Sequence, residues 1–570
     1  HRIMRRRTRS VSVARSAWTN AVQAFLESGE YRPRPGDEPL RDPKTPESEN
    51  ERIIKQAHFK EWIDHWCAVR AANEAAERAN WDKYAPGRAF HYGYGPPLIN
   101  SYYYGNLYNA RYYGWDARMV KKLGRWADSY QMEAYAYDFG REPESYTPSI
   151  ALTKLAIPEL GCRWELYGAG GYVDDYRTNE GCAPHGLHYP SRNFMAHHTA
   201  EMTLAPWYFD GKAFHPAGNT HMAPGFGEFT KELLIGMVDG LRAAGDVKSF
   251  APVRSPAFVD SWVAADLDPS WKVGGVNNSA AEAPAYAYLQ SRLAGLAGGF
   301  FLDIADVGKL DRRRADMLVL PSMRGATPEQ VAAIRKQYAA GMALVCFDDA
   351  SGLEDLFGIR RLPEGVAVSH VERAAGDTLL TGLGADVTGE RVGFGGTVWY
   401  DLAGATEVLS CTDSGHKRVA PMLTLHRPAN KPGAVFFAAG ANEVTRRAST
   451  FGGLTNEGEV LSKLVQHAVR RGLLAVADPV VQVTPPATVL AFRRPDGKLH
   501  VVVMEASFPF SIGKPVEVEL TLRGAGADKA RLECERPLRE RPGARGERRV
   551  SLTLQPDEAV PMTVSGLRLE

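Results

Sequence analysis

The stretch of sequence that decides the fold is ADMLVLPSMRGATPEQVAAIRKQYAAGMALVC, which covers residues 315–346. It holds two apolar runs, MLVL at residues 317–320 and MALVCF beginning at residue 342. Neither run alternates with polar residues, so both are expected to be strands that are buried on both faces. Strands of this kind belong to parallel sheets, whose faces are covered by the helices that connect the strands.

The segment between these runs predicts one connecting helix. Thr327 stands at the N-cap position, Pro328 at the first helical position, and Gln330 three residues after the cap. A threonine cap and a glutamine at this spacing form a capping box, and proline suits the first turn because an N–H there has no helical partner. The helix is expected to end at Gly341. The whole stretch therefore predicts a strand, a helix and a parallel strand.

The rest of the chain divides into regions with different patterns. Upstream, a long helix is expected at residues 51–80, followed by four strands that each precede a helical stretch. These four candidate strands are residues 88–94, 130–137, 162–167 and 203–209. Repeats of strand and helix are typical of a (β/α)8 barrel, and four of them make half of one. From about residue 475 onward, short alternating runs between Pro and Gly turns predict a small antiparallel β-sandwich.

Composition sets limits on the class of protein. The chain has 570 residues, which suggests three or four domains, and its 44% hydrophobic and 24% charged residues are ordinary for a globular protein. A formal net charge of +1 gives no reason to expect nucleic-acid or membrane partners. The six cysteines are scattered without a CxxC pair, so neither a zinc site nor a disulfide framework is indicated. The basic start, HRIMRRRTRS, is interpreted as a disordered arm or the stump of a longer protein, so the sequence does not decide between a cytoplasmic and a periplasmic location.

In the order of its regions and in the ADMLVLPS segment, the chain resembles the family 42 glycoside hydrolases, which are β-galactosidases of clan A. The resemblance implies an α/β multidomain protein: a partial (β/α)8 barrel, a flavodoxin-like domain related in fold to class I glutamine amidotransferases, and a small β-sandwich. The expected boundaries are residues 1–247, 248–474 and 475–570. The resemblance also implies a bacterial enzyme that hydrolyses a β-linked sugar with retention, needs no cofactor, and forms a homo-oligomer, a trimer, through its middle domain.

Glu165, in CRWELYGAGG, matches the position of the nucleophile in that clan. The clan's nucleophile is a glutamate that ends the seventh barrel strand, and counting back from the linker near residue 250 makes residues 162–167 the seventh strand. A retaining glycosidase needs two carboxyl groups about 5 Å apart, of which one attacks the anomeric carbon. Arg163 and Tyr167 alternate with Glu165 on the strand, and a cation or hydroxyl close by keeps a carboxylate ionised.

The second carboxyl group is harder to assign. Glu133, on the preceding strand, takes the role of nucleophile if the strand count is shifted by one; otherwise Glu133 and Tyr135 are expected to bind substrate. The clan's acid/base glutamate ends the fourth strand, but the residues before Ser16 contain no carboxylate. We interpret this as a chain that lacks the first half of its barrel. The alternative hypothesis is a catalytically inactive carbohydrate-binding or assembly protein derived from a glycosidase.

Aromatic and histidine residues near the expected strand ends favour a carbohydrate site over a metal site. His91, Tyr92 and Trp207 are candidates because sugar rings stack on aromatic faces and donate hydrogen bonds to polar side chains. No metal is expected. The histidines cluster without the spacing of a metal motif, and those in the long loops are assigned to substrate contacts: His185, His188 and His215. In the middle domain, Cys346 lies within a strand without a glycine-flanked elbow, so it is predicted to be a core thiol rather than an amidotransferase nucleophile.

Overall fold

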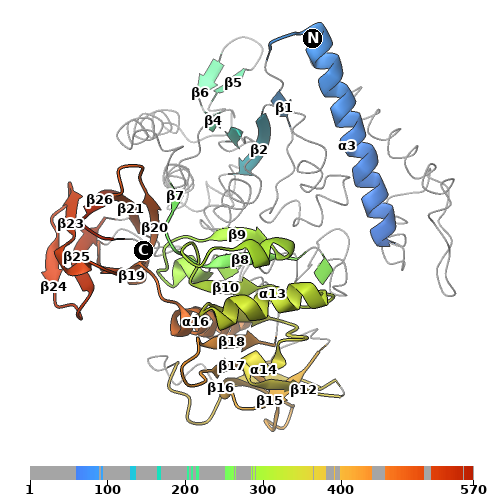
Figure 1. Ribbon diagram of the computed structural model, residues 1–570, viewed down its shortest axis with the longest axis vertical. Helices are drawn as coiled ribbons and strands as arrows, with labels where there is room; N and C mark the ends of the chain where they lie inside the picture. The colour runs from blue at the N-terminus through green and yellow to red at the C-terminus, as the bar shows by residue number, and fades with distance from the viewer. Residues whose placement is uncertain are drawn as a thin grey trace.

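The computed structural model describes most of the second half of the chain and shorter parts of the first half. The described residues are 59–88, 91–93, 129–135, 163–167, 202–204, 207–209, 214–216, 251–261, 263–264, 284, 287–288, 290–363, 365–380, 390–391, 398–438, 456–505, 515–555 and 558–568. Figure 1 shows a large central sheet with α13 and α16, a two-sheet sandwich beside it, and the short N-terminal strands at the other end of the molecule.

The N-terminal strands form a parallel sheet in which spatial order follows chain order. The four strands are β1 (His91–Gly93), β2 (Ser129–Tyr135), β3 (Arg163–Tyr167) and β4 (Met202–Leu204). Each pairs in parallel with the next, as adjacent strands of a (β/α)8 barrel do. All four strands were expected near these positions. Helix α3 (Phe59–Tyr84) matches most of the long helix expected before them, whose first residues lie outside the described part.

The last of these strands is shorter than expected. Residues 203–209 were expected to form one strand, but β4 ends at Leu204 and a new strand, β5 (Trp207–Phe209), begins three residues later. β5 pairs antiparallel with β6 (Phe214–Pro216) in a separate two-stranded sheet. The reason lies in Pro206, because proline has no N–H to donate to a sheet and restricts the residue before it.

In the described part of the chain, the central sheet has nine strands, and five of them are parallel. These five are β8 (Ala257–Asp260), β9 (Phe300–Asp303), β10 (Met317–Leu320), β11 (Ala343–Phe347) and β18 (Ala434–Phe437). Their spatial order is β9-β8-β10-β11-β18, which is the 2-1-3-4-5 order of flavodoxin-like folds. Every residue of β10 and β11 is buried, so both faces of these strands are covered. The two strands expected from the deciding stretch are therefore confirmed, together with their parallel pairing.

The sheet expected to be parallel is mixed, because antiparallel strands follow beyond β18. The remaining strands of the sheet are antiparallel: β17 (Arg418–His426), β16 (Thr406–Thr412), β13 (His370–Arg373) and β14 (Glu390–Arg391). Strands β16 and β17 are joined by a tight turn in which Asp413 accepts three backbone N–H bonds. A connection this short can only join antiparallel neighbours. β12 (Ile359–Arg361) and β15 (Tyr400–Leu402) form a separate antiparallel pair.

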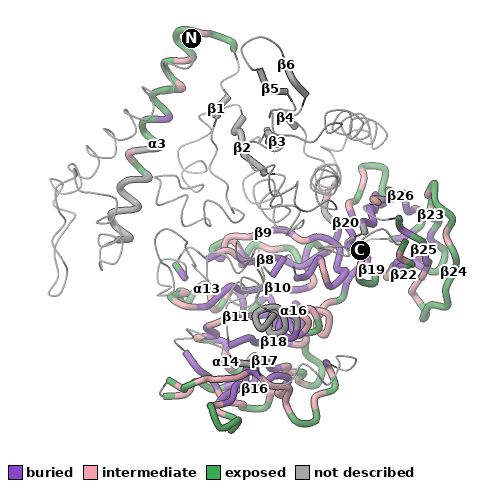
Figure 2. Tube along the Cα trace, turned by 180° about the vertical axis from the view of Figure 1, so that it is seen from behind, coloured by how far each residue is buried: buried purple, intermediate pink, exposed green. Residues whose placement is uncertain are grey.

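Helix α13 (Pro328–Ala339) begins with the expected capping box. The N–H of Gln330 donates to Thr327 Oγ1 at 3.3 Å, and the N–H of Thr327 donates to Gln330 Oε1 at 2.9 Å. Other helices with described bounds in the central part include η3 (Ile304–Lys309), α14 (Glu354–Phe357) and α16 (Asn456–Val476). Figure 2 shows that buried residues are concentrated in the strands of the central sheet, where they form one continuous core.

The C-terminal region is an antiparallel sandwich, as expected. One sheet has the order β19 (Val481–Val483), β22 (Val516–Arg523), β25 (Glu547–Leu554) and β24 (Arg539–Arg541). The other has the order β23 (Arg531–Cys534), β26 (Ala559–Ser565), β21 (Leu499–Glu505), β20 (Ala487–Arg493) and β7 (Ala251–Pro252), and a short helix η5 (Ala527–Lys529) precedes β23. Residues of both sheets share a core of their own. Strands β23, β24 and β26 were not expected, and the sequences of β23 and β24 are mostly polar and exposed.

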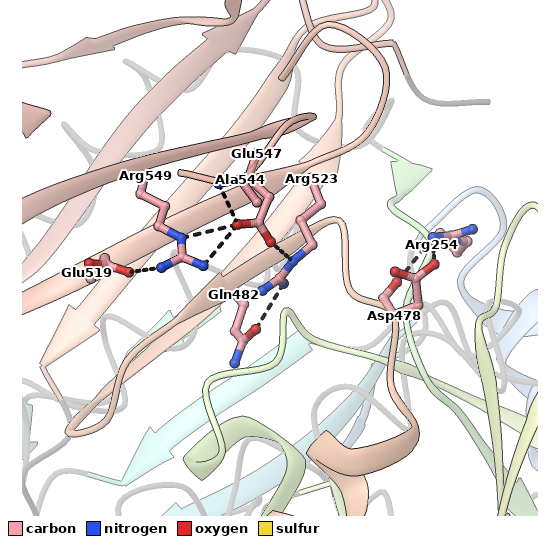
Figure 3. Close-up of polar contacts among 8 residues, drawn as sticks. All are labelled: Arg254, Asp478, Gln482, Glu519, Arg523, Ala544, Glu547 and Arg549. Atoms are coloured by element: carbon pink, nitrogen blue, oxygen red, sulfur yellow. Dashed lines mark hydrogen bonds and ion pairs between the residues drawn. The ribbon is translucent and has the colours of Figure 1, made fainter. Parts of the chain in front are cut away.

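A ladder of ion pairs runs across one sheet of the sandwich, as Figure 3 shows. Glu547 on β25 accepts from Arg523 Nε at 2.8 Å and from Arg549 Nη2 at 2.9 Å. The hydrogen bond from Arg523 is the main reason that the pKa of Glu547 is lowered. Arg523 also donates to Gln482 on β19 at 2.9 Å. These contacts connect the three strands β19, β22 and β25 in a fixed register.

The sandwich and the central sheet are joined by contacts between residues far apart in the chain. Arg254 Nη2 lies 2.7 Å from Asp478 Oδ2, and this pair is also visible in Figure 3. The N–H of Asp478 donates to Asp316 Oδ2 at 3.0 Å, just before β10. The N–H of Val483 on β19 donates to the carbonyl of Gly295 at 2.9 Å. β7, which precedes the central sheet in the chain, adds a strand to the sandwich.

Candidate active site

The four parallel N-terminal strands bring most of the predicted site residues together. Glu165 is the third of the five residues of β3 and lies two positions before the carboxyl end of the strand. Its register partners are Glu133 on β2 and Thr203 on β4. Neighbouring strands lie about 4.8 Å apart, so the backbones of the two glutamates are separated by about that distance. In barrel enzymes, catalytic groups come from the carboxyl ends of the strands.

Other predicted site residues on β2 and β3 hold positions on the same face of the sheet as Glu165. Positions two apart on a strand share a face of the sheet, and register partners on parallel strands share it as well. Arg163 is two positions before Glu165, while Tyr167 and its register partner Tyr135 are two positions after it. By register, five of the predicted site residues therefore belong to one face of β2 and β3: Glu133, Tyr135, Arg163, Glu165 and Tyr167. Such a group combines two acids, one base and two aromatic rings, which is the chemistry that sugar recognition uses.

The other three predicted residues lie farther from this group. The register places His91 on the same face but four positions before Glu133, or about 13 Å along the strand direction. It places Tyr92 three positions before Glu133, an odd number, and therefore on the opposite face. Trp207 begins β5, outside the four-stranded sheet. Their contact with a ligand stays a prediction.

Of the three histidines predicted to contact the substrate, one lies within the described residues. His215 lies at the centre of β6 and pairs with Tyr208 on β5. His185 and His188 lie outside the described residues. Within the described ranges, no group of three His, Cys, Asp or Glu side chains is arranged to hold a metal ion. None of the helices in these ranges is both long enough and apolar enough to span a bilayer.

Cys346 is confirmed as a core thiol. It is fully buried in β11, and its Sγ lies 3.3 Å from the carbonyl oxygen of Asp349. Burial raises the pKa of the Cys346 thiol well above its ordinary value, and the neighbouring carboxylates raise it further. A thiol in this state does not form the thiolate that a nucleophile needs.

A polar cluster that the sequence analysis did not identify follows β10 and β11. Asp348 adopts a left-handed backbone conformation with φ 63° directly after β11. Its Oδ2 accepts from Ser322 Oγ at 3.1 Å and pairs with Arg324 Nη2 at 3.1 Å. These bonds tie together the loops that follow the two strands. The signal was the adjacent acid pair in FDDASG, at the end of a run of buried residues.

Next to this cluster, Asp349 is almost completely buried, and its Oδ1 accepts several hydrogen bonds. Its Oδ1 accepts from Tyr400 Oη at 2.9 Å and from the N–H of Ser351 at 2.8 Å. The N–H of Ala350 in turn donates to Tyr400 Oη at 3.0 Å. Burial raises the pKa of Tyr400, so its hydroxyl keeps the proton that it donates. The cluster therefore links the loop after β11 to β15.

Comparisons with known proteins support the fold. No protein-family model matches the chain, and no curated protein matches its sequence. Among solved structures, α-L-fucosidase isoenzyme 2 from Paenibacillus thiaminolyticus matches with a TM-score of 0.56 at 13% identity, over 96% of this chain and 75% of that one. A β-galactosidase from Rahnella sp. R3 matches with a TM-score of 0.52 at 11% identity, over 88% of this chain and 67% of that one.

A third match is Gan42B, a family 42 β-galactosidase from G. stearothermophilus. Its TM-score is 0.50 at 12% identity, and the match covers 98% of this chain and 74% of that one. Since the matched structures include family 42 enzymes, the fold expected from the sequence agrees with the fold found. At identities of 11–13%, the likeness concerns the fold, and the chain therefore has a fold like that of these glycoside hydrolases.

Proposed function

We propose that the protein is a retaining glycoside hydrolase that acts on a β-linked sugar, with Glu165 as the nucleophile. The observation that carries this proposal is the place of Glu165 near the carboxyl end of the third of four parallel strands, in a chain whose fold resembles that of glycosidases. The substrate class that fits best is a β-galactoside or a related fragment of a plant polysaccharide, because two of the matched structures are β-galactosidases.

The proposed reaction is a double displacement. A carboxylate oxygen of Glu165 forms a bond to the anomeric carbon while the bond from that carbon to the leaving oxygen breaks, and water later releases the sugar from Glu165. The position of Arg163, two residues earlier on the same face, supports an ionised nucleophile because a nearby cation stabilises a carboxylate. Tyr135 and Tyr167, two residues later on that face, offer rings for the C–H surface of the sugar.

The experiment is a comparison of two substitutions on neighbouring strands. Glu165→Gln in the full-length protein should lower hydrolysis of an activated aryl β-galactoside by at least about 1,000-fold, because an amide cannot form the glycosyl-enzyme bond. Met132→Leu is the matched control, since Met132 lies on β2 on the opposite face from Glu133. It should leave turnover within about twofold.

A labelling experiment identifies the nucleophile directly. An activated 2-fluoro-galactoside should trap the enzyme and modify the peptide that contains Glu165. Modification of the Glu133 peptide would show that the strand count is shifted by one. Near-normal turnover by Glu165→Gln would refute the assignment, and binding of galactosides without any hydrolysis by the unaltered protein would support a carbohydrate-binding protein instead.

We also propose that the protein assembles as a trimer through its central α/β unit, as its resemblance to family 42 implies. Light scattering coupled to size-exclusion chromatography should give three times the mass of the chain. A mass equal to one or two chains would contradict this proposal without touching the assignment of Glu165.

A further inference from the structure

Two short connections between the central sheet and the sandwich are bonded to each other. The first runs from β7, a strand of the sandwich, to β8 in the central sheet, and it contains Arg254. The second runs from α16, which packs on the central sheet, to β19 of the sandwich, and it contains Asp478. Arg254 Nη2 donates to the carbonyl oxygen of Asp478 at 3.1 Å and to its Oδ2 at 2.7 Å, and Figure 3 shows this pair. One ion pair therefore fastens the two connections together.

Asp316 bonds this pair to the central sheet. It directly precedes β10, and its carbonyl oxygen accepts from the N–H of Ala343 on β11 at 3.1 Å. Its Oδ2 accepts from the N–H of Asp478 at 3.0 Å. Two positions earlier, the carbonyl of Arg314 accepts from the N–H of Ser255 in the first connection at 3.2 Å. The segment that leads into β10 therefore holds both connections.

The surroundings of the Asp316 carboxyl group disfavour a negative charge. Its Oδ1 is buried and has no hydrogen-bond partner in the described part of the chain. The described charged side chains that act on it are Arg254 and Asp478, one of each sign, and the bonds from Arg254 Nη2 go to Asp478. Burial is the main reason that the pKa of Asp316 is raised, and the charge of Asp478 adds to this effect. The N–H of Asp478 and the charge of Arg254 oppose it.

We propose that Asp316 is a proton-operated latch between the central sheet and the sandwich, closed when its carboxyl group is neutral and loosened when that group ionises. In the neutral state, no charge is buried at Asp316 and Arg254 stays bound to Asp478. In the ionised state, a second negative charge lies buried beside Asp478, and opening the junction to water relieves it. This inference does not depend on the proposed glycosidase function.

The direction of the pH effect follows from the two states of the junction. When the junction is open, Asp316 is in water and ionises with its ordinary pKa of 3.8, whereas its pKa in the closed junction is higher. Below pH 3.8 both states are protonated and the closed state is fully favoured. As the pH rises from there to the raised pKa, the ratio of open to closed molecules should increase by up to about tenfold for each pH unit. Above the raised pKa the increase should stop.

Hydrogen exchange at the junction measures this ratio. The amides of Ser255 and Asp478 both donate to the segment before β10, so their exchange requires opening there. After correction for the intrinsic exchange rate at each pH, exchange of these amides in the unaltered protein should increase at least about tenfold between about pH 4 and pH 7. Asp316→Asn keeps the shape of the side chain but cannot ionise, so its corrected exchange should change less than about twofold over this range.

Two further variants make the test specific. Asp311→Asn is the matched control, because Asp311 lies in the same segment before β10 but is exposed and pairs with Arg313 at 2.7 Å. It should show the same pH dependence of junction exchange as the unaltered protein. Asp478→Asn removes the like charge beside Asp316 and releases Arg254 toward it. Because this lowers the pKa of Asp316, the increase in exchange between about pH 4 and pH 7 should be at least about threefold smaller.

The outcomes decide the inference in either direction. An equal pH dependence in Asp316→Asn and the unaltered protein would overturn it, and so would junction exchange that does not change with pH in the unaltered protein. If Asp316→Asn does not fold, Asp478→Asn decides, because its side chain is 72% exposed and its replacement is expected to be tolerated. An undiminished increase in that variant would overturn the inference, and a diminished one would support it. The assignment of Glu165 is tested separately by its own substitution.

Discussion

At the scale of single residues, Tyr400 and Asp349 form a deeply buried polar contact in the central unit. Tyr400 is fully buried, and its hydroxyl both donates to Asp349 and accepts from the N–H of Ala350. A buried donor or acceptor that loses its partner costs more than an average hydrogen bond contributes. Removing the hydroxyl of Tyr400 is therefore expected to lower the free energy of unfolding by more than the loss of one average hydrogen bond does.

Tyr400→Phe should lower the free energy of unfolding by about 2 kcal/mol, because it removes one donor from a buried carboxylate and one acceptor from a backbone N–H. Tyr338→Phe is the matched control, since the hydroxyl of Tyr338 makes one bond, to the carbonyl of Pro432 at 2.9 Å. It should cost about 1 kcal/mol. Urea unfolding measures both values, and an equal loss in the two variants would contradict the role given to Asp349.

The burial of His500 predicts how the free energy of unfolding depends on pH. It is almost fully buried in β21, and burial, together with the smaller effect of the Arg494 charge, lowers its pKa from the ordinary 6.5 to about 4. Between pH 6.5 and pH 4 the unfolded chain binds this proton more readily than the folded one, so the contribution of His500 is fully present above pH 6.5 and is lost on acidification. Between pH 7 and pH 5, His500 should account for a decrease of about 2 kcal/mol in the free energy of unfolding.

His500→Gln should therefore reduce the difference in unfolding free energy between pH 7 and pH 5 by about 2 kcal/mol. The measurement is urea unfolding at both pH values. The same slope in His500→Gln as in the unaltered protein would show that His500 does not titrate in this range.

At the scale of elements, the start of α13 shows how one cap fixes a helix within the sheet domain. Both halves of the capping box are present, so two N–H groups of the first turn are satisfied by side chains. Thr327→Ala should lower the free energy of unfolding by about 1 kcal/mol, and Thr327→Ser should restore nearly all of it because serine keeps the hydroxyl. Chemical unfolding of the two variants provides the measurement. A serine variant as unstable as the alanine variant would point to lost methyl packing instead.

At the scale of the whole molecule, the sandwich is held to the central sheet by a close approach of two backbones. Gly295 has φ +83°, and a Cβ added there would lie 1.8 Å from the carbonyl oxygen of Val483. Gly497 has a similar φ of +79°, but a Cβ there would meet nothing within 4 Å. The two glycines therefore separate the cost of backbone conformation from the cost of the contact.

Gly497→Ala should cost about 1 kcal/mol, which is the ordinary penalty of a left-handed alanine. Gly295→Ala should cost at least about 3 kcal/mol more, because the clash is with backbone rather than a flexible side chain. It should also expose the junction near residue 478 to proteolysis. Urea unfolding measures both values. Equal stability of the two variants would mean that the contact between Gly295 and Val483 contributes nothing to the free energy of unfolding.

The sequence by itself determined the local units of this protein. The apolar runs of β10 and β11, the cap at Thr327 and most of the sandwich strands follow from patterns within a few residues, and the structure has them where they were expected. The residue types of the candidate site were found in the same way. Local patterns suffice here because helix caps and buried strands depend on neighbouring residues.

Only the tertiary structure decided which distant segments meet. The antiparallel half of the central sheet, the addition of β7 to the sandwich and the register that pairs Glu133 with Glu165 all join residues that are far apart in the chain. A strand carries the same alternation whichever partner it pairs with, so its sequence does not specify neighbour or register. The candidate site depends on that choice, because a shift of one residue between β2 and β3 would move Glu133 to the other face.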